Sequence, residues 1–130
     1  MNSDETQLRL LKLWHVIGAL MVAYIVYVSL TPNPIPMPGR WTDKVFHFAG
    51  YFSVMAWYRQ LPVRRNLMAA VFILMGIGLE FGQMLVKTRS FEWADMTVNI
   101  LGVLVAAFVF RGSLARLLML AEKIVLVRRI

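Results

Sequence analysis

The chain has 130 residues, of which 59% are hydrophobic and 16% are charged, and its formal net charge is +7. Soluble domains carry about a quarter charged residues, so this composition argues against a water-soluble globular protein and indicates a membrane protein. The absence of cysteine excludes disulfides, thiolate metal sites and a cysteine nucleophile.

The first predicted helix is the apolar run from Leu13 to Leu30. A secretory signal would also be apolar, but Asp4 and Glu5 precede this run and no small-x-small cleavage site follows it. We therefore expect a retained membrane helix. After this helix, prolines occupy every second position from Pro32 to Pro38, four in all, and this spacing favours an extended outer loop.

Three further apolar runs predict three more helices, at about residues 44–61, 66–86 and 94–111. The tail, residues 113–130, has apolar residues at helical spacing, but charged residues interrupt them. We expect this tail to be an amphipathic helix on the inner leaflet rather than a fifth span. The predicted fold class is thus all-α: a single domain, residues 1–130, forming a polytopic membrane bundle of four transmembrane helices plus the tail.

The distribution of basic residues predicts that both termini lie in the cytoplasm. With the amino terminus inside, ten of the 14 Lys and Arg residues fall in inner segments and four in outer segments. This excess agrees with the positive-inside rule. Tryptophans are expected at both interfaces, with Trp14 and Trp57 near inner ends and Trp41 and Trp93 near outer ends.

Polar side chains inside membrane helices are costly and are functional candidates by default. Here they gather in the outer halves of the last three predicted helices, at similar depths. The candidates for ligand binding are Asp43, Lys44, His47, Tyr51, Glu80, Gln83, Arg89, Asp95 and Asn99. The predicted inner half has no comparable group, so we expect a site that opens to the outside rather than a channel. Lys44, Lys87 and Arg89 are expected on its rim, where they could bind carboxylates or a lipid phosphate.

Two segments of the chain resemble the signatures of VanZ-like membrane proteins. The first runs from Asp43 to Phe52 and reads DKVFHFAGYF. The second matches in order and spacing at Glu80, Gln83, Arg89, Ser90, Phe91, Asp95, Asn99 and Gly102. This resemblance covers roughly residues 43–102 and implies a bacterial cell-envelope protein of the cytoplasmic (inner) membrane. The namesake of that family is associated with resistance to glycopeptide antibiotics, specifically teicoplanin.

Three classes of function are compatible with these residues. In the first, the protein binds a lipid-linked or phosphate-bearing envelope precursor, or an antibiotic, from the outer leaflet. In the second, it is an enzyme acting on such a lipid, with His47 as general base or nucleophile, Glu80 or Asp95 orienting it, and Arg89 clamping the anion. In the third, the polar residues only hold the helices together. We favour the first class, because no motif is specific enough to identify an enzyme.

The sequence predicts neither a cofactor nor a metal. A metal site built from His47, Glu80 and Asp95 is disfavoured, because one imidazole with oxygen ligands is a weak set for zinc. Lys44 would also repel a cation at such a site. The expected partner is a membrane lipid or lipid-linked envelope precursor, and not nucleic acid, while a homo-oligomer remains open.

Overall fold

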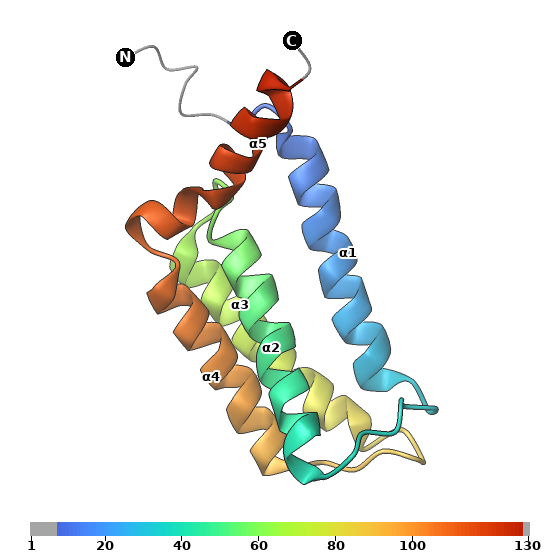
Figure 1. Ribbon diagram of the computed structural model, residues 1–130. Helices are drawn as coiled ribbons and strands as arrows, with labels where there is room; N and C mark the ends of the chain where they lie inside the picture. Colours follow the sequence, from blue (N-terminus) through green and yellow to red (C-terminus); the bar gives the residue numbers. More distant parts are fainter. Residues whose placement is uncertain (1–7, 129–130) are drawn as a thin grey trace.

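The structure, a computed structural model, describes residues 8–128, and all regular elements in that range are helices. In chain order they are α1 (Leu11–Leu30), α2 (Arg40–Tyr58), α3 (Arg65–Gln83), α4 (Trp93–Val109), the 3-10 helix η2 (Gly112–Arg116) and α5 (Leu117–Val127). The first four helices run in alternating directions, so α2 and α4 begin at the same end of the molecule (Figure 1). The all-helical class predicted from the sequence is confirmed.

The start of α2 differs from the sequence prediction in a way that affects the candidate site. Gly39 has a φ of 76°, a backbone conformation that glycine adopts without strain. It turns the chain out of the proline segment, so α2 begins at Arg40 rather than at Lys44. Asp43 and Lys44 therefore lie inside the first turns of the helix instead of at its entrance.

The core of the bundle lies where α2, α3 and α4 meet. Val54 and Met55 of α2 and Val103 of α4 have no exposed surface, and Phe72 of α3 is 2% exposed. α2 and α4 approach each other closely at Gly102, where a Cβ atom would lie 2.7 Å from the carbonyl oxygen of Phe48. This contact fixes the register of the two helices that contribute most of the candidate site.

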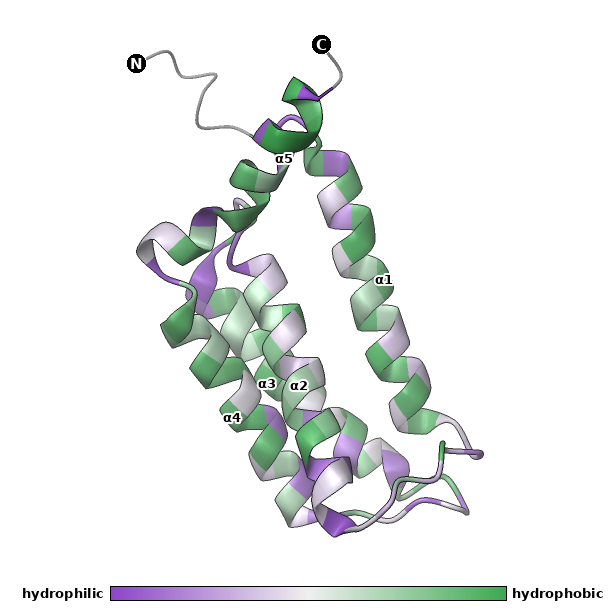
Figure 2. Ribbon diagram, viewed as in Figure 1, coloured by the Kyte–Doolittle hydropathy of each residue, from purple (hydrophilic) through white to green (hydrophobic). Residues whose placement is uncertain are grey.

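Two helices of the described chain, α1 and α3, are long and apolar enough to cross a membrane. A third span is added if α4 and the segment Gly112–Val127, which meet at an angle of 92°, are taken together as one bent span. α2 is too polar to qualify by this measure, since Arg40, Asp43 and Lys44 occupy its first turns. The four transmembrane helices expected from the sequence are therefore supported only in part, although the middle of the bundle is largely hydrophobic (Figure 2).

The tail forms a helix, α5, that contacts the beginning of α1. The Glu122 carboxylate accepts hydrogen bonds from the backbone N–H groups of Arg9 and Leu10, each at 2.9 Å, and from the Trp14 indole nitrogen. The two ends of the described chain are thereby joined at one end of the bundle (Figure 1). Asp4, Glu5 and the last two residues of the expected tail lie outside the described residues.

Candidate functional site

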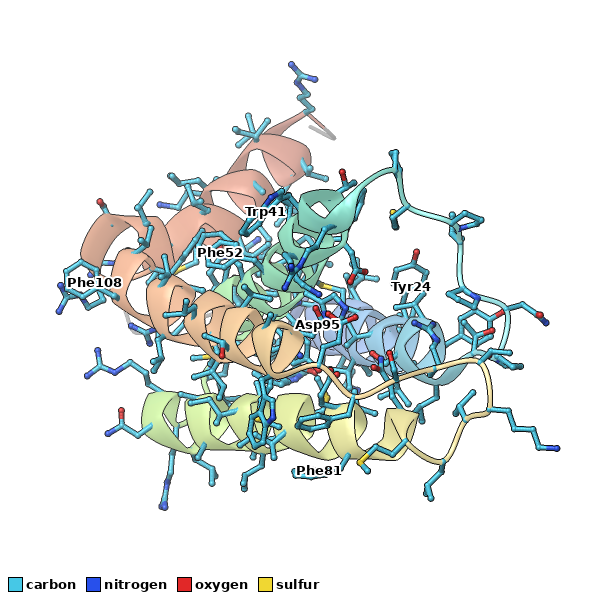
Figure 3. All side chains as sticks on the ribbon, turned by 90° about the horizontal axis from the view of Figure 1, so that it is seen from below. Tyr24, Trp41, Phe52, Phe81, Asp95 and Phe108 are labelled. Carbon is cyan, nitrogen blue, oxygen red and sulfur yellow. The ribbon has the colours of Figure 1, made fainter. Side chains whose placement is uncertain are left out.

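The predicted site residues come together at the end of the bundle where α2 and α4 begin and α3 ends. Because α3 runs opposite to its two neighbours, its last turns lie beside the first turns of α2 and α4. Hydrophilic residues gather at this end (Figure 2). Seen from this side, Asp95 lies toward the middle of the bundle, whereas Phe81 and Phe108 point outward (Figure 3). We call the group formed here the polar cluster: Asp43, Lys44, His47, Tyr51, Glu80, Glu92, Asp95 and Asn99.

Lys44 is the cation at the centre of the polar cluster. Its ammonium group is hydrogen-bonded to Asp95, lies 2.6 Å from a Glu92 oxygen and lies 3.5 Å from Oδ2 of Asp43. Only 7% of its surface is exposed. The sequence placed Lys44 on an accessible rim, but the early start of α2 carries it into the bundle, where the carboxylates surround it.

Glu92 is a member of the cluster that the sequence analysis did not include among the site residues. It immediately precedes α4, and the only sequence signal for it is its position three residues before Asp95, one helical turn away. Its hydrogen bond with Lys44 holds the pKa of the Glu92 carboxyl below its ordinary value. Its backbone N–H donates to the Glu80 carboxylate at 2.7 Å, which links α3 to the start of α4.

His47 lies beside Lys44 and bridges α2 and α4. Its Nδ1 is 3.0 Å from Oδ1 of Asn99, and its Nε2 is 3.6 Å from a carboxylate oxygen of both Asp43 and Asp95. The sequence predicts Glu80 or Asp95 as the acid beside His47, and in the structure Asp43 and Asp95 occupy that position.

The sequence predicts Gln83 and Arg89 as site residues, but in the structure their side chains bond to the end of α1. Both donate to backbone carbonyls at the end of α1: Gln83 to Ser29 at 3.0 Å, and Arg89 to Thr31 at 3.0 Å and to Val28. The last carbonyls of a helix have no partner within it, and a cation there is favoured by the helix dipole. Arg89 therefore fixes the end of α1.

Tyr51 lies one turn deeper than His47 and is 3% exposed. Its hydroxyl has no hydrogen-bond partner among the described residues. A buried polar atom without a partner is uncommon in proteins, and in functional sites a ligand or a water molecule often supplies the missing bond. The polar cluster is therefore not a fully satisfied network.

Two carboxylates connect the buried part of the cluster with the surface. The side chains of Asp43 and Glu92 are 40% and 44% exposed, whereas Glu80 is 1% exposed. Arg40, whose charge acts on Glu92, is exposed, and so is Lys87 in the loop between α3 and α4. The site thus combines an enclosed cation, Lys44, with carboxylates of which two reach the surface.

The sequence model of the VanZ/LLP1 family matches residues 2–118 of the chain. The match spans all four helices of the bundle and the whole polar cluster. Comparisons with curated proteins and with solved structures found no match.

Proposed function

The chain belongs to the VanZ/LLP1 family, and its apolar helices mark it as a membrane protein of the VanZ type. On this premise we propose that it crosses the bacterial cytoplasmic membrane four times, with both termini inside. At the outward-facing polar cluster it binds a lipid-linked, phosphate-bearing envelope component. The observation that carries this proposal is the burial of a charged, partly unsatisfied cluster at one end of an otherwise apolar bundle.

The alternating directions of α1 to α4 support four crossings. With 17 residues, α4 is about 26 Å long, close to the roughly 30 Å of a bilayer's hydrocarbon core. The charges of α2 lie in its first turns, at the level of the headgroups, and Lys44 is paired there. Trp41 and Trp93 are exposed at the same level, as interfacial tryptophans are.

The basic residues support an outward-facing cluster. Of the 14 Lys and Arg residues, the four nearest the cluster are Arg40, Lys44, Lys87 and Arg89, and the other ten fall at the opposite end or in the tail. The positive-inside rule places the end with more basic residues in the cytoplasm.

The internal partners of the basic residues determine which of them would contact a phosphate. Lys44 is enclosed by carboxylates and Arg89 by the carbonyls of α1, so neither is free to bind a ligand without breaking these contacts. Arg40 and Lys87 are exposed beside Glu92 and the end of α3. We assign the phosphate contact to these two residues.

The other two classes of function lead to different outcomes. For an enzyme, His47 would act as the base beside Asp43 and Asp95, and the bound lipid would be converted to product. For a purely structural network, a Tyr51 hydroxyl that has no hydrogen-bond partner within residues 8–128 would be an unexplained cost. The unsatisfied hydroxyl favours a ligand, and an antibiotic molecule remains an alternative occupant to a lipid.

Native mass spectrometry of the protein released from its own membrane tests this proposal. We expect a phospholipid or polyprenyl-phosphate species to stay bound to the wild type and to be lost from Arg40→Ala/Lys87→Ala, because the variant lacks both exposed cations. Binding to the wild type should weaken as salt is added. Conversion of the retained species on incubation, absent in His47→Ala, would instead identify an enzyme.

The matched control is Arg116→Ala/Lys123→Ala, which removes two exposed basic residues at the opposite end of the molecule. It should retain the lipid. Equal retention by both double variants, or equal loss from both, would contradict a phosphate site at the polar cluster.

A further inference from the structure

Asp43 and Asp95 each have one carboxylate oxygen facing Lys44 and the other facing His47. Asp43 Oδ2 lies 3.5 Å from the Lys44 ammonium, and its Oδ1 lies 3.6 Å from Nε2 of His47. Asp95 bonds to Lys44 through Oδ1, and its Oδ2 lies 3.6 Å from the same Nε2. One oxygen of each carboxylate thus remains available on the His47 side.

In a neutral His47, the contact with Asn99 favours the tautomer that carries the proton on Nδ1. Nδ1 lies 3.0 Å from the Asn99 amide oxygen, which can only accept, so Nδ1 is the donor. In the neutral imidazole, Nε2 then presents a lone pair to two carboxylate oxygens. A histidine held through one nitrogen by a carbonyl oxygen, with the other nitrogen facing acidic oxygens, has the second-shell arrangement of a metal ligand.

The charge around Lys44 also favours a divalent cation. The three carboxylates that pair with Lys44, those of Asp43, Glu92 and Asp95, are opposed by its single ammonium, which leaves two negative charges in excess within this group when His47 is neutral. Lys44 lies on the far oxygens of the two aspartates and not between them and His47. One divalent ion on the His47 side would balance the excess.

We propose that Asp43, His47 and Asp95 bind one divalent transition-metal cation, with Zn²⁺ as the reference ion and Asn99 as the positioning residue. One ligand atom from each of the three residues lies within 4.8 Å of the others. Ligands held about 2.0 to 2.2 Å from a zinc ion lie roughly 3.0 to 3.6 Å apart, so a small movement completes the site. Three protein ligands leave a fourth position open to water or to a ligand oxygen.

The structure changes one of the two reasons for which the sequence disfavoured a metal. The ligand set still has a single imidazole, with Asp43 in place of Glu80, but Lys44 occupies the aspartate oxygens that face away from His47. The proposal does not depend on lipid binding, since a metal titration needs only the purified protein.

Isothermal titration of the full-length, chelator-stripped protein with Zn²⁺ in detergent provides the test. The chain has two histidines, so His15→Ala, on the exposed face of α1, is a matched control for His47→Ala. We expect the wild type and His15→Ala to bind one Zn²⁺ per chain and His47→Ala to lose this binding. Asn99→Ala should weaken the affinity about 10- to 100-fold, because it releases the ring of His47.

Asp43→Asn provides a second test that does not depend on the folding of His47→Ala, because the Asp43 side chain is 40% exposed. It should also lose stoichiometric binding while its circular dichroism and elution volume stay those of the wild type. The proposal is overturned if the wild type binds no Zn²⁺ at one equivalent, if Asp43→Asn binds as the wild type does, or if His15→Ala loses the ion instead.

Discussion

At the scale of single residues, Lys44 is the ion-pair partner of a buried acid, Asp95, within an apolar bundle. Asp95 is 4% exposed, and Lys44 is the cation that the structure brings to it. Two opposite charges removed from water together are tolerated, whereas one alone is very costly. The pair therefore holds the starts of α2 and α4 together only as long as both members are present.

Lys44→Met should destabilise the folded protein by about 3–5 kcal/mol, because it leaves Asp95 buried without its cation. Unfolding by sodium dodecyl sulfate in mixed micelles, followed by circular dichroism, measures this loss. Lys87→Met, which removes an exposed lysine, is the control and should unfold like the wild type. A wild-type unfolding curve for Lys44→Met would show that the ion pair does not hold the helices together.

All members of the polar cluster except Glu92 were identified from the sequence, but several of their partners were not. Charged residues in apolar helices are conspicuous in any hydropathy reading, and α-helical spacing places His47 one turn from Asp43. The contacts of Arg89 join residues 58 and 61 positions apart in the chain, and no local pattern encodes them. The same holds for Lys44 and Glu92, whose contact depends on how α2 and α4 pack.

At the scale of elements, the docking of α5 on α1 depends on one carboxylate. Burial raises the pKa of Glu122, but hydrogen bonds from the Trp14 indole and from the backbone of Leu10 and Arg9 lower it, and the net pKa lies below its ordinary 4.5. Because the docked state holds this carboxyl at a lower pKa than the free helix does, docking gains stability from the charge above about pH 4.5. That stability is lost as the pH falls through the lower pKa of the docked state.

We therefore expect acid to release α5 from α1. Spin labels on Lys12→Cys and Ile124→Cys, two exposed positions, should give a narrow distance distribution at pH 7 and a broad one below the docked-state pKa. Glu122→Gln should give a broader distribution than the wild type at pH 7, because its neutral amide replaces a charged acceptor, and hydrogen bonds to charged groups contribute about 1.5–3 kcal/mol against about 0.5–1.5 kcal/mol for neutral ones.

Lys123→Gln changes the exposed neighbour of Glu122 and is the control, so it should behave as the wild type at both pH values. Distributions that are the same at pH 7 and in acid for the wild type would show that the Glu122 charge does not hold α5. The helical nature of the tail followed from its apolar spacing, but its partner did not, because Glu122 and Leu10 are 112 positions apart.

At the scale of the whole molecule, hydropathy and charge distribution support different numbers of membrane crossings. Length and composition identify two spans, or three with the bent pair, because the polar cluster lowers the hydropathy of α2. The distribution of basic residues and the alternating helices support four crossings. The charged residues of the polar cluster make α2 look less like a membrane span, which explains why α2 is the least hydrophobic of the four.

The polar cluster can meet an envelope component only if its end of the bundle faces the outside, so sidedness is the most direct test. The chain has no cysteine, and single cysteines can replace Pro36 and Lys87 at the cluster end and Arg64 and Ser113 at the other. We expect a membrane-impermeant maleimide to label positions 36 and 87 in intact cells, and positions 64 and 113 only after permeabilisation. Labelling of positions 36 and 64 from the same side would show that α2 does not cross the membrane. Protection of positions 36 and 87 in intact cells would place the polar cluster in the cytoplasm and would contradict the proposed function.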